Sequence, residues 1–264
     1  MSMNRLPVST RAAADAPVPV VLVHGVGLDR AMWAPQLAHL GGCVSAAPDL
    51  PGHGIRQRER WHLQAAVDSV LTAVDELGAA PAVLVGLSLG GYVALRAAAQ
   101  APHRVAGLLI SGCTVDYRSP LLARLCRLTW LLCRLYPDRP VAAWQRAALR
   151  RAYPQAAPQL ADGVAQDLRV VGDALLQLTQ VDPFADLGGF PGPVRVLVGD
   201  RDRRNLRGLE AARAALPAHA TADIMPGGHL LNLDNPDAFS AAIDQTCQDA
   251  RRTASTCPEQ ARGQ

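Results

Sequence analysis

The sequence contains no lysine, so all 26 of its Lys-plus-Arg residues are arginine. This absence excludes reactions that depend on an active-site lysine, such as those of some lyases. The formal net charge is only +3, which is too small to indicate a nucleic-acid partner. We therefore expect a protein that does not bind nucleic acid.

Long apolar runs and paired cysteines are missing as well. No apolar stretch reaches the roughly 20 residues that a membrane-spanning helix needs, so no membrane span is expected. The cysteines are Cys43, Cys113, Cys126, Cys133, Cys247 and Cys257. They form no C-x-x-C pair, which favours reduced thiols over disulfides or a metal site. The opening MSMNRLPVST lacks the order of a secretion signal, so we expect a cytoplasmic protein.

The chain, with 264 residues of which 49% are hydrophobic and 19% charged, is suited to one globular α/β domain. Continuous aliphatic runs predict strands buried on both faces of a mostly parallel sheet, with helices between them. The expected strands are 19–23, 43–47, 82–85, 105–110, 194–198 and 221–225, with a weak one at 6–10. The expected helices outside the central insertion include 33–40, 63–77, 206–216 and 237 to about 251.

Residues 82–96 carry the most informative motif. Strand-forming aliphatics run into Gly86-Leu87-Ser88-Leu89-Gly90, and an Ala-rich helical pattern follows. A serine nucleophile must stand clear at the tip of a tight turn, and flanking glycines let the backbone pass closely. The helix start after it favours developing negative charge. Ser88 is therefore a candidate nucleophile, although a Gly-rich turn with an incidental serine fits the five residues alone.

Other turns also follow predicted strands. His24-Gly25-Val26-Gly27 offers the backbone N–H of Val26 as a candidate oxyanion donor. Asp49 and His53, in Asp49-Leu50-Pro51-Gly52-His53-Gly54, are expected to tie their loop together by hydrogen bonds. Asp202, in Gly199-Asp200-Arg201-Asp202, lies at the carboxyl edge of the sheet, where α/β folds build their sites.

Ser88, Asp202 and His229 appear in this order, each in a loop after a strand. This order, together with HGVG, DLPGHG, GLSLGG, GDRD and GGH, resembles the α/β-hydrolase fold superfamily over about residues 19–251, and most closely its small capped serine hydrolases. The resemblance implies a mostly parallel sheet flanked by helices, with a helical cap insertion. It also implies that Ser88 is the nucleophile, His229 the general base and Asp202 the residue that orients the imidazole.

The same resemblance assigns the oxyanion hole to the backbone N–H groups of Val26 and Leu89. Asp200 and Asp234 are competing carboxylates, but Asp202 has the family's spacing from Gly199. Two features depart from the family pattern. The N-terminal hairpin is shortened, and the loop of Arg201, Arg203 and Arg204 is unusually basic, for which the sequence offers no explanation.

The βα alternation stops at residue 114 and resumes at 194. We therefore expect a core of about 17–113 and 191–251, a cap insertion of about 114–190 and a disordered tail of about 253–264. Leu121, Leu125 and Leu128 of the insertion, with Trp33, are predicted to line an acyl pocket. Residues 115–153 hold eight arginines against two aspartates, a net +6, and would attract an acyl carrier or CoA. Alternatively, the leucines only pack the insertion onto the core, and the arginines are solvated.

The resemblance leaves three classes of function open. The first is a hydrolase of a small-molecule carboxylic ester or thioester. The second is a C–C bond hydrolase or lyase, and the third is a ligand receptor without turnover. A serine at position 88 argues against dehalogenases and epoxide hydrolases, which carry an aspartate there. No metal or organic cofactor is expected, because the Ser-His-Asp set performs its own proton transfers.

Overall fold

The computed structural model describes residues 17–78, 80–154, 160, 164, 167–187 and 189–256. Three of the expectations fall outside these residues: the strand at 6–10, the state of Cys257 and the part of the tail from 257 onward. The five described cysteines are free thiols.

Six parallel strands form one sheet in the described part of the chain, in the order β2-β1-β3-β4-β5-β6. They are β1 (Val20–Val23), β2 (Ser45–Ala46), β3 (Ala82–Leu87), β4 (Val105–Ser111), β5 (Val194–Gly199) and β6 (Thr221–Met225). The residues of β1 and β3 are buried throughout, as expected for central parallel strands covered on both faces. This arrangement confirms the predicted sheet.

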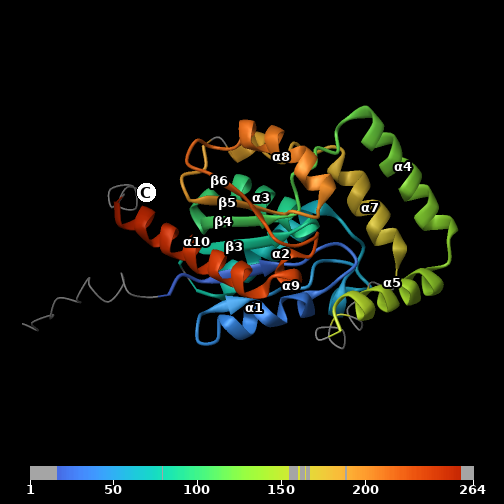
Figure 1. Ribbon diagram of the computed structural model, residues 1–264, viewed down its shortest axis with the longest axis horizontal. Helices are drawn as coiled ribbons and strands as arrows, with labels where there is room; N and C mark the ends of the chain where they lie inside the picture. Colours follow the sequence, from blue (N-terminus) through green and yellow to red (C-terminus); the bar gives the residue numbers. More distant parts are fainter. Residues whose placement is uncertain are drawn as a thin grey trace, which may run out of the picture.

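Helices cover both faces of this sheet (Figure 1). Adjacent strand residues point to opposite faces, so Leu84 and Val85 of β3 belong to separate hydrophobic clusters. The cluster of Leu84 is completed by α2 (Leu63–Glu76), α3 (Leu89–Gln100) and α8 (Arg203–Ala215), whereas that of Val85 includes residues beside α1 (Ala34–His39) and of α10 (Pro236–Thr256). The two clusters hold the carboxyl ends of the strands at one edge, where the candidate site lies.

Several predicted boundaries were wrong. The strand expected at 43–47 is reduced to β2, and the helix expected at 33–40 is a 3-10 helix (Arg30–Trp33) followed by α1. Helix α8 begins three residues early because Asp202 caps it, accepting a hydrogen bond from the backbone N–H of Asn205. Helix α10 continues into the tail that was expected to be disordered from 253, and buried Ala250 secures its last turns.

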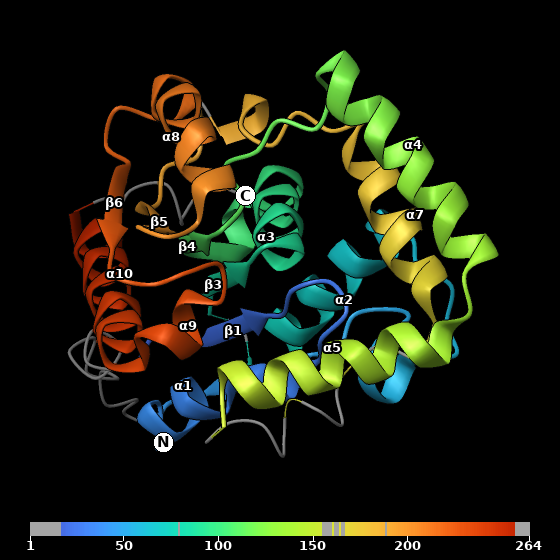
Figure 2. The same ribbon diagram turned by 45° about the vertical axis from the view of Figure 1, so that its right-hand side comes forward.

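Where the structure describes the chain between β4 and β5, it contains the α-helices α4 (Pro120–Leu135), α5 (Asp138–Ala152) and α7 (Leu168–Leu178). In Figure 2, α4 and α7 lie side by side and α5 runs across their lower end. Val170 of α7 joins one core cluster and Leu149 of α5 joins the other. The insertion therefore rests on the core through α5 and α7, and α4 is its outer layer.

Candidate active site

Ser88 occupies the turn between β3 and α3. Its backbone has φ +56° and ψ −119°, and it is the one non-glycine residue with a positive φ in the described ranges. A Cβ at Gly86 would overlap the carbonyl group of Gly90, and a Cβ at Gly90 would overlap that of Val23. The flanking glycines are therefore needed for this close approach. The strained conformation costs about 1–3 kcal/mol for a residue with a side chain.

Asp202 and His229 meet at the same edge of the sheet. The Nδ1 atom of His229 lies 2.7 Å from Oδ2 of Asp202. The same carboxylate oxygen accepts a 2.7 Å hydrogen bond from Nδ2 of Asn205, whose Oδ1 accepts from the backbone N–H of Thr114. Because an ionised carboxylate can only accept, the neutral form of the His229 imidazole carries its proton on Nδ1 and keeps Nε2 as an acceptor.

The Asp202 carboxyl is held in its ionised form. Burial raises its pKa, but the hydrogen bonds from His229 and Asn205 outweigh burial, so the pKa is lowered below its usual range. Asn205 is thus a positioning residue that the sequence analysis missed. Its place three residues after Asp202, in the first turn of a helix, was the available signal.

The competing carboxylates have other partners. Oδ1 of Asp200 accepts a 2.9 Å hydrogen bond from the backbone N–H of Gly227, and Oδ2 of Asp234 accepts a 2.5 Å one from that of Gly228. Both therefore support the loop that leads into His229. Tyr153, which follows α5, also hydrogen-bonds Asp234, and burial and this carboxylate raise the tyrosine pKa to about 12.

The basic loop is explained in part by the same contacts. Arg201 lies 3.7 Å from Asp234, and Arg204 hydrogen-bonds Tyr117. Arg203 is exposed, and no contact of the described residues explains it.

Two buried histidines fix the loop that carries Val26. The Nε2 atom of His53 accepts a 3.1 Å hydrogen bond from the backbone N–H of Gly27, and its Nδ1 donates to the carbonyl of Pro51 at 3.0 Å. His24 accepts from the backbone N–H of Leu50 at 2.9 Å. Asp49 accepts from the backbone N–H groups of Arg30 and Ile55. The predicted tying role of Asp49 and His53 is confirmed.

These imidazoles are neutral in the folded protein. Burial lowers the pKa of His24 to about 4, while burial and then the neighbouring His24 lower that of His53 to about 3, with Asp49 partly opposing the second shift. The unfolded chain takes up these protons near pH 6.5. Since the unfolded state then binds more protons, stability is full above pH 6.5 and falls as the pH drops towards 4.

We therefore expect the free energy of unfolding to fall by about 1.4 kcal/mol per pH unit for each buried histidine in this window. His53→Gln can keep both hydrogen bonds but cannot titrate, so its stability should depend less steeply on pH. Urea unfolding of both proteins at pH 7.5, 6.5, 5.5 and 4.5 measures the difference. Parallel pH profiles would show that His53 does not contribute to the acid sensitivity.

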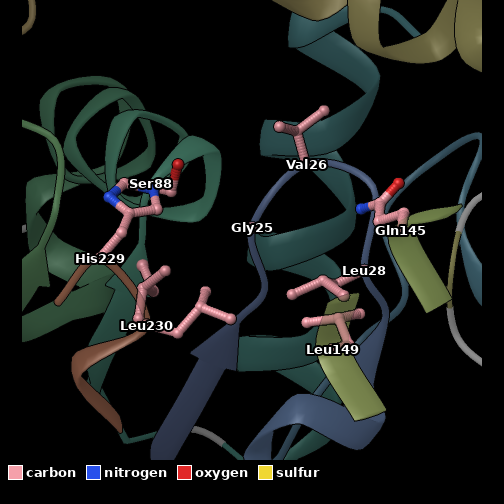
Figure 3. A pocket seen from close by; sticks show the side chains of 9 residues that line it. Gly25, Val26, Leu28, Ser88, Gln145, Leu149, His229 and Leu230 are labelled. Carbon is pink, nitrogen blue, oxygen red and sulfur yellow. The ribbon is translucent and has the colours of Figure 1, made fainter. Parts of the chain in front are cut away.

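A cavity of about 240 Å³ opens beside Ser88 (Figure 3). Ser88 and His229 both line it, as does Val26. Helix α5 contributes Gln145 and Leu149 from the opposite side. The remaining lining residues are Gly25, Leu28, Leu87 and Leu230. The cavity thus combines a hydroxyl and an imidazole with walls that are mostly aliphatic.

The four residues predicted for the acyl pocket do not line this cavity. Trp33 is fully buried in the core, and Leu121, Leu125 and Leu128 are exposed on α4. That prediction is corrected: α5 rather than α4 reaches the cavity. Ala142, Gln145 and Leu149 share one face of α5, but the arginine- and alanine-rich sequence around them hides this pattern.

Of the predicted oxyanion donors, Val26 borders the cavity, and Leu89 is the first residue of α3 after Ser88. The first N–H groups of a helix have no intrahelical acceptor, so that of Leu89 is available. Among the described residues there is no cluster of three or more His, Cys, Asp or Glu side chains that could hold a metal. Nor does any described helix have the length and apolar character to cross a bilayer.

Known proteins resemble this chain along most of its length. The model of the alpha/beta hydrolase family matches residues 20–242. The chain is 33% identical to the dihydrolipoyllysine-residue acetyltransferase component of the acetoin cleaving system of Pseudomonas putida, over 80% of this chain and 54% of that protein. It is also 33% identical to a pimeloyl-[acyl-carrier protein] methyl ester esterase of Methylococcus capsulatus, over 70% of this chain and 76% of that one.

The chain spans about half the length, or less, of several curated relatives that it matches. Among solved structures, a thermophilic esterase from Thermogutta terrifontis superposes with a TM-score of 0.75 at 26% identity, covering 89% of this chain and 91% of that one. Because the family match extends over well over half of the sequence and the fold agrees with it, this chain belongs to the alpha/beta hydrolase family.

Proposed function

We propose that this protein is a serine hydrolase that cleaves a carboxylic ester or thioester with an apolar acyl group. One observation carries the proposal. Ser88, in a strained turn, shares a cavity with His229, whose Nδ1 lies 2.7 Å from the Asp202 carboxylate. This is the arrangement of a nucleophile, a base and a group that orients the base.

In the proposed reaction, Oγ of Ser88 attacks the substrate carbonyl carbon while Nε2 of His229 takes the hydroxyl proton. The backbone N–H groups of Val26 and Leu89 stabilise the oxyanion of the tetrahedral intermediate. When the intermediate collapses, the bond to the leaving alcohol or thiol breaks and His229 returns the proton to it. A water molecule then attacks the acyl-enzyme with the same base, releasing the acid and restoring Ser88.

The aliphatic cavity walls support an apolar acyl group. Leu28, Leu149 and Leu230 surround the space beside Ser88, and each acyl methylene buried there contributes about 0.8 kcal/mol. Leu149 and Gln145 come from α5, so we propose that the helical insertion is a cap whose α5 encloses the substrate.

An acyl carrier or CoA is the proposed partner for the acyl group. The relative from Methylococcus capsulatus is named for an ester of an acyl-carrier protein, which supports this choice. The net charge of +6 over residues 115–153 would attract the phosphates of such a partner at low salt.

Two measurements test the proposal on the purified wild-type protein. The first is labelling by a fluorophosphonate, which reacts with an activated serine beside an oxyanion hole. The second is kcat/KM for p-nitrophenyl esters and CoA thioesters from acetyl to dodecanoyl. We expect labelling and a preference for longer acyl groups. A folded protein that neither reacts with the probe nor hydrolyses any ester would be assigned to the ligand-receptor class instead.

Enlarging Leu149 is expected to shorten the accepted acyl chain. Leu149→Trp fills part of the cavity, and excluding two methylenes at about 0.8 kcal/mol each lowers kcat/KM by about tenfold or more for long acyl esters. Acetyl ester hydrolysis should change much less. The matched control is Leu125→Trp on the exposed face of α4, which should leave the profile unchanged. If Leu125→Trp alone changed the acyl-length profile, the acyl group would bind against α4, as the sequence predicted, and not against α5.

A further inference from the structure

The outer face of α4 carries an unpartnered row of leucines. Leu121, Leu125, Leu128, Leu132 and Leu135 alternate at four- and three-residue spacing and are between 40% and 70% exposed. The opposite face of α4 packs against α7, where Gly172 lies close to Trp130 and Cys133. The face of α4 that carries Cys126, Trp130 and Cys133 is therefore turned towards α7, and the leucine row is left in contact with solvent. An apolar row of this kind marks an interaction surface.

Positive charge flanks this leucine row. Helix α4 contains no acidic residue. Arg134 is paired with Asp173 and stacks on Trp130, whereas Arg124 and Arg127 are exposed and have no ion pair with any described residue. The surface thus combines exposed leucines with two arginines on the same helix that no described carboxylate neutralises.

A second copy of the chain is a poor match for this surface. Pairing two α4 helices through their leucine rows would bring Arg124 and Arg127 of both copies close together, with no carboxylate on either helix to offset the repulsion. Figure 2 shows α4 as the outermost helix of the insertion. A single protruding helix with an apolar row and basic flanks fits a planar apolar layer that has a negatively charged border.

We propose that α4 binds the surface of a membrane that contains anionic phospholipids. The helix lies in the plane of the interface, with its leucine row among the upper acyl chains and with Arg124 and Arg127 at the headgroup phosphates. Basic side chains reach the phosphates while their aliphatic stems stay in apolar surroundings. This proposal does not depend on the hydrolase activity. Its consequence for that activity is that the cap, with α5 over the cavity, would sit at the lipid surface.

Vesicle co-sedimentation of the full chain tests the proposal. We expect binding to vesicles of 70% phosphatidylcholine and 30% phosphatidylglycerol at 50 mM NaCl, little binding to pure phosphatidylcholine, and release at 500 mM NaCl. Arg124→Gln with Arg127→Gln should lower the partition coefficient by roughly 25-fold, about fivefold for each arginine. Leu132→Ser with Leu135→Ser should lower it at least about tenfold.

Matched controls remove aliphatic and arginine side chains at exposed positions outside α4. Ile55→Ser with Ile224→Ser takes away two exposed isoleucines, and Arg58→Gln with Arg207→Gln takes away two exposed arginines. The isoleucine control should leave vesicle binding unchanged. The arginine control lowers the net charge of the protein and should weaken binding by no more than about twofold. Circular dichroism checks folding, and Leu135→Ser alone replaces the double leucine variant if that variant unfolds.

Three results would overturn the proposal. The wild-type protein could fail to sediment with anionic vesicles at low salt, or the leucine variant could bind as the wild type does. The wild type could also be a dimer in light scattering that the leucine variant converts to a monomer, which would assign the leucine row to a second copy.

Discussion

Ser88→Ala is expected to abolish ester hydrolysis, with kcat falling by on the order of 10⁵ to 10⁶. The change removes the attacking Oγ and leaves the cavity walls intact, so KM should move far less than kcat. Alanine at φ +56° carries the same backbone strain as serine, so the fold should be retained. Steady-state kinetics on the best p-nitrophenyl ester, with a melting curve for each protein, measures both expectations.

The same substitution should remove fluorophosphonate labelling. Ser119→Ala, at the exposed N-cap of α4, is the matched control and should label as the wild type does. If Ser88→Ala keeps its label or its turnover while Ser119→Ala is unchanged, the nucleophile is a different residue, and the proposed mechanism does not hold.

Asp202→Asn is expected to lower kcat by about 10³ to 10⁴ with little loss of stability. An asparagine amide offered to Nδ1 of His229 favours the tautomer with the proton on Nε2, and Nε2 can then no longer accept the serine proton. Asparagine caps helices about as well as aspartate, so the start of α8 should persist. Stopped-assay kinetics together with urea unfolding separate the two effects.

Asp200→Asn is the matched comparison for that result. Its side-chain oxygen can still accept the hydrogen bond from the backbone N–H of Gly227, so activity should fall less than about tenfold. A larger loss at Asp200 than at Asp202 would identify Asp200 as the carboxylate that orients His229.

The strands were the most predictable part of the fold. β3, β4, β5 and β6 lie within one or two residues of the expected ranges. For β3, β4 and β5 the reason is that aliphatic runs of this length form strands that are buried on both faces, whereas β6 is an edge strand and is largely exposed. The meeting of Asp202 with His229 was also foreseeable. Loops that follow parallel strands emerge at the same edge of the sheet, so residues far apart in sequence come together there.

The orientation of the insertion could not be predicted from its sequence. Periodicity shows that α4 has an apolar face, but it does not show what that face contacts. The structure buries Cys126 and packs Trp130 against α7, leaving the leucines outside. The burial of α5 was obscured because its sequence is rich in arginine and alanine, and only Leu149 and Ala142 mark its inner side. Tertiary packing therefore decided which helix reaches the cavity.

The backbone of Ser88 also has a consequence for protein engineering. Glycine adopts a positive φ without strain but loses about 0.5–1 kcal/mol more backbone entropy on folding. Ser88→Gly would therefore stabilise the fold by up to about 2 kcal/mol, a sizeable share of the roughly 5–15 kcal/mol that typically separates folded from unfolded chains. A library selected only for thermostability would enrich this substitution and thereby discard the proposed nucleophile. Directed evolution of this scaffold therefore needs a selection for turnover alongside the selection for heat resistance.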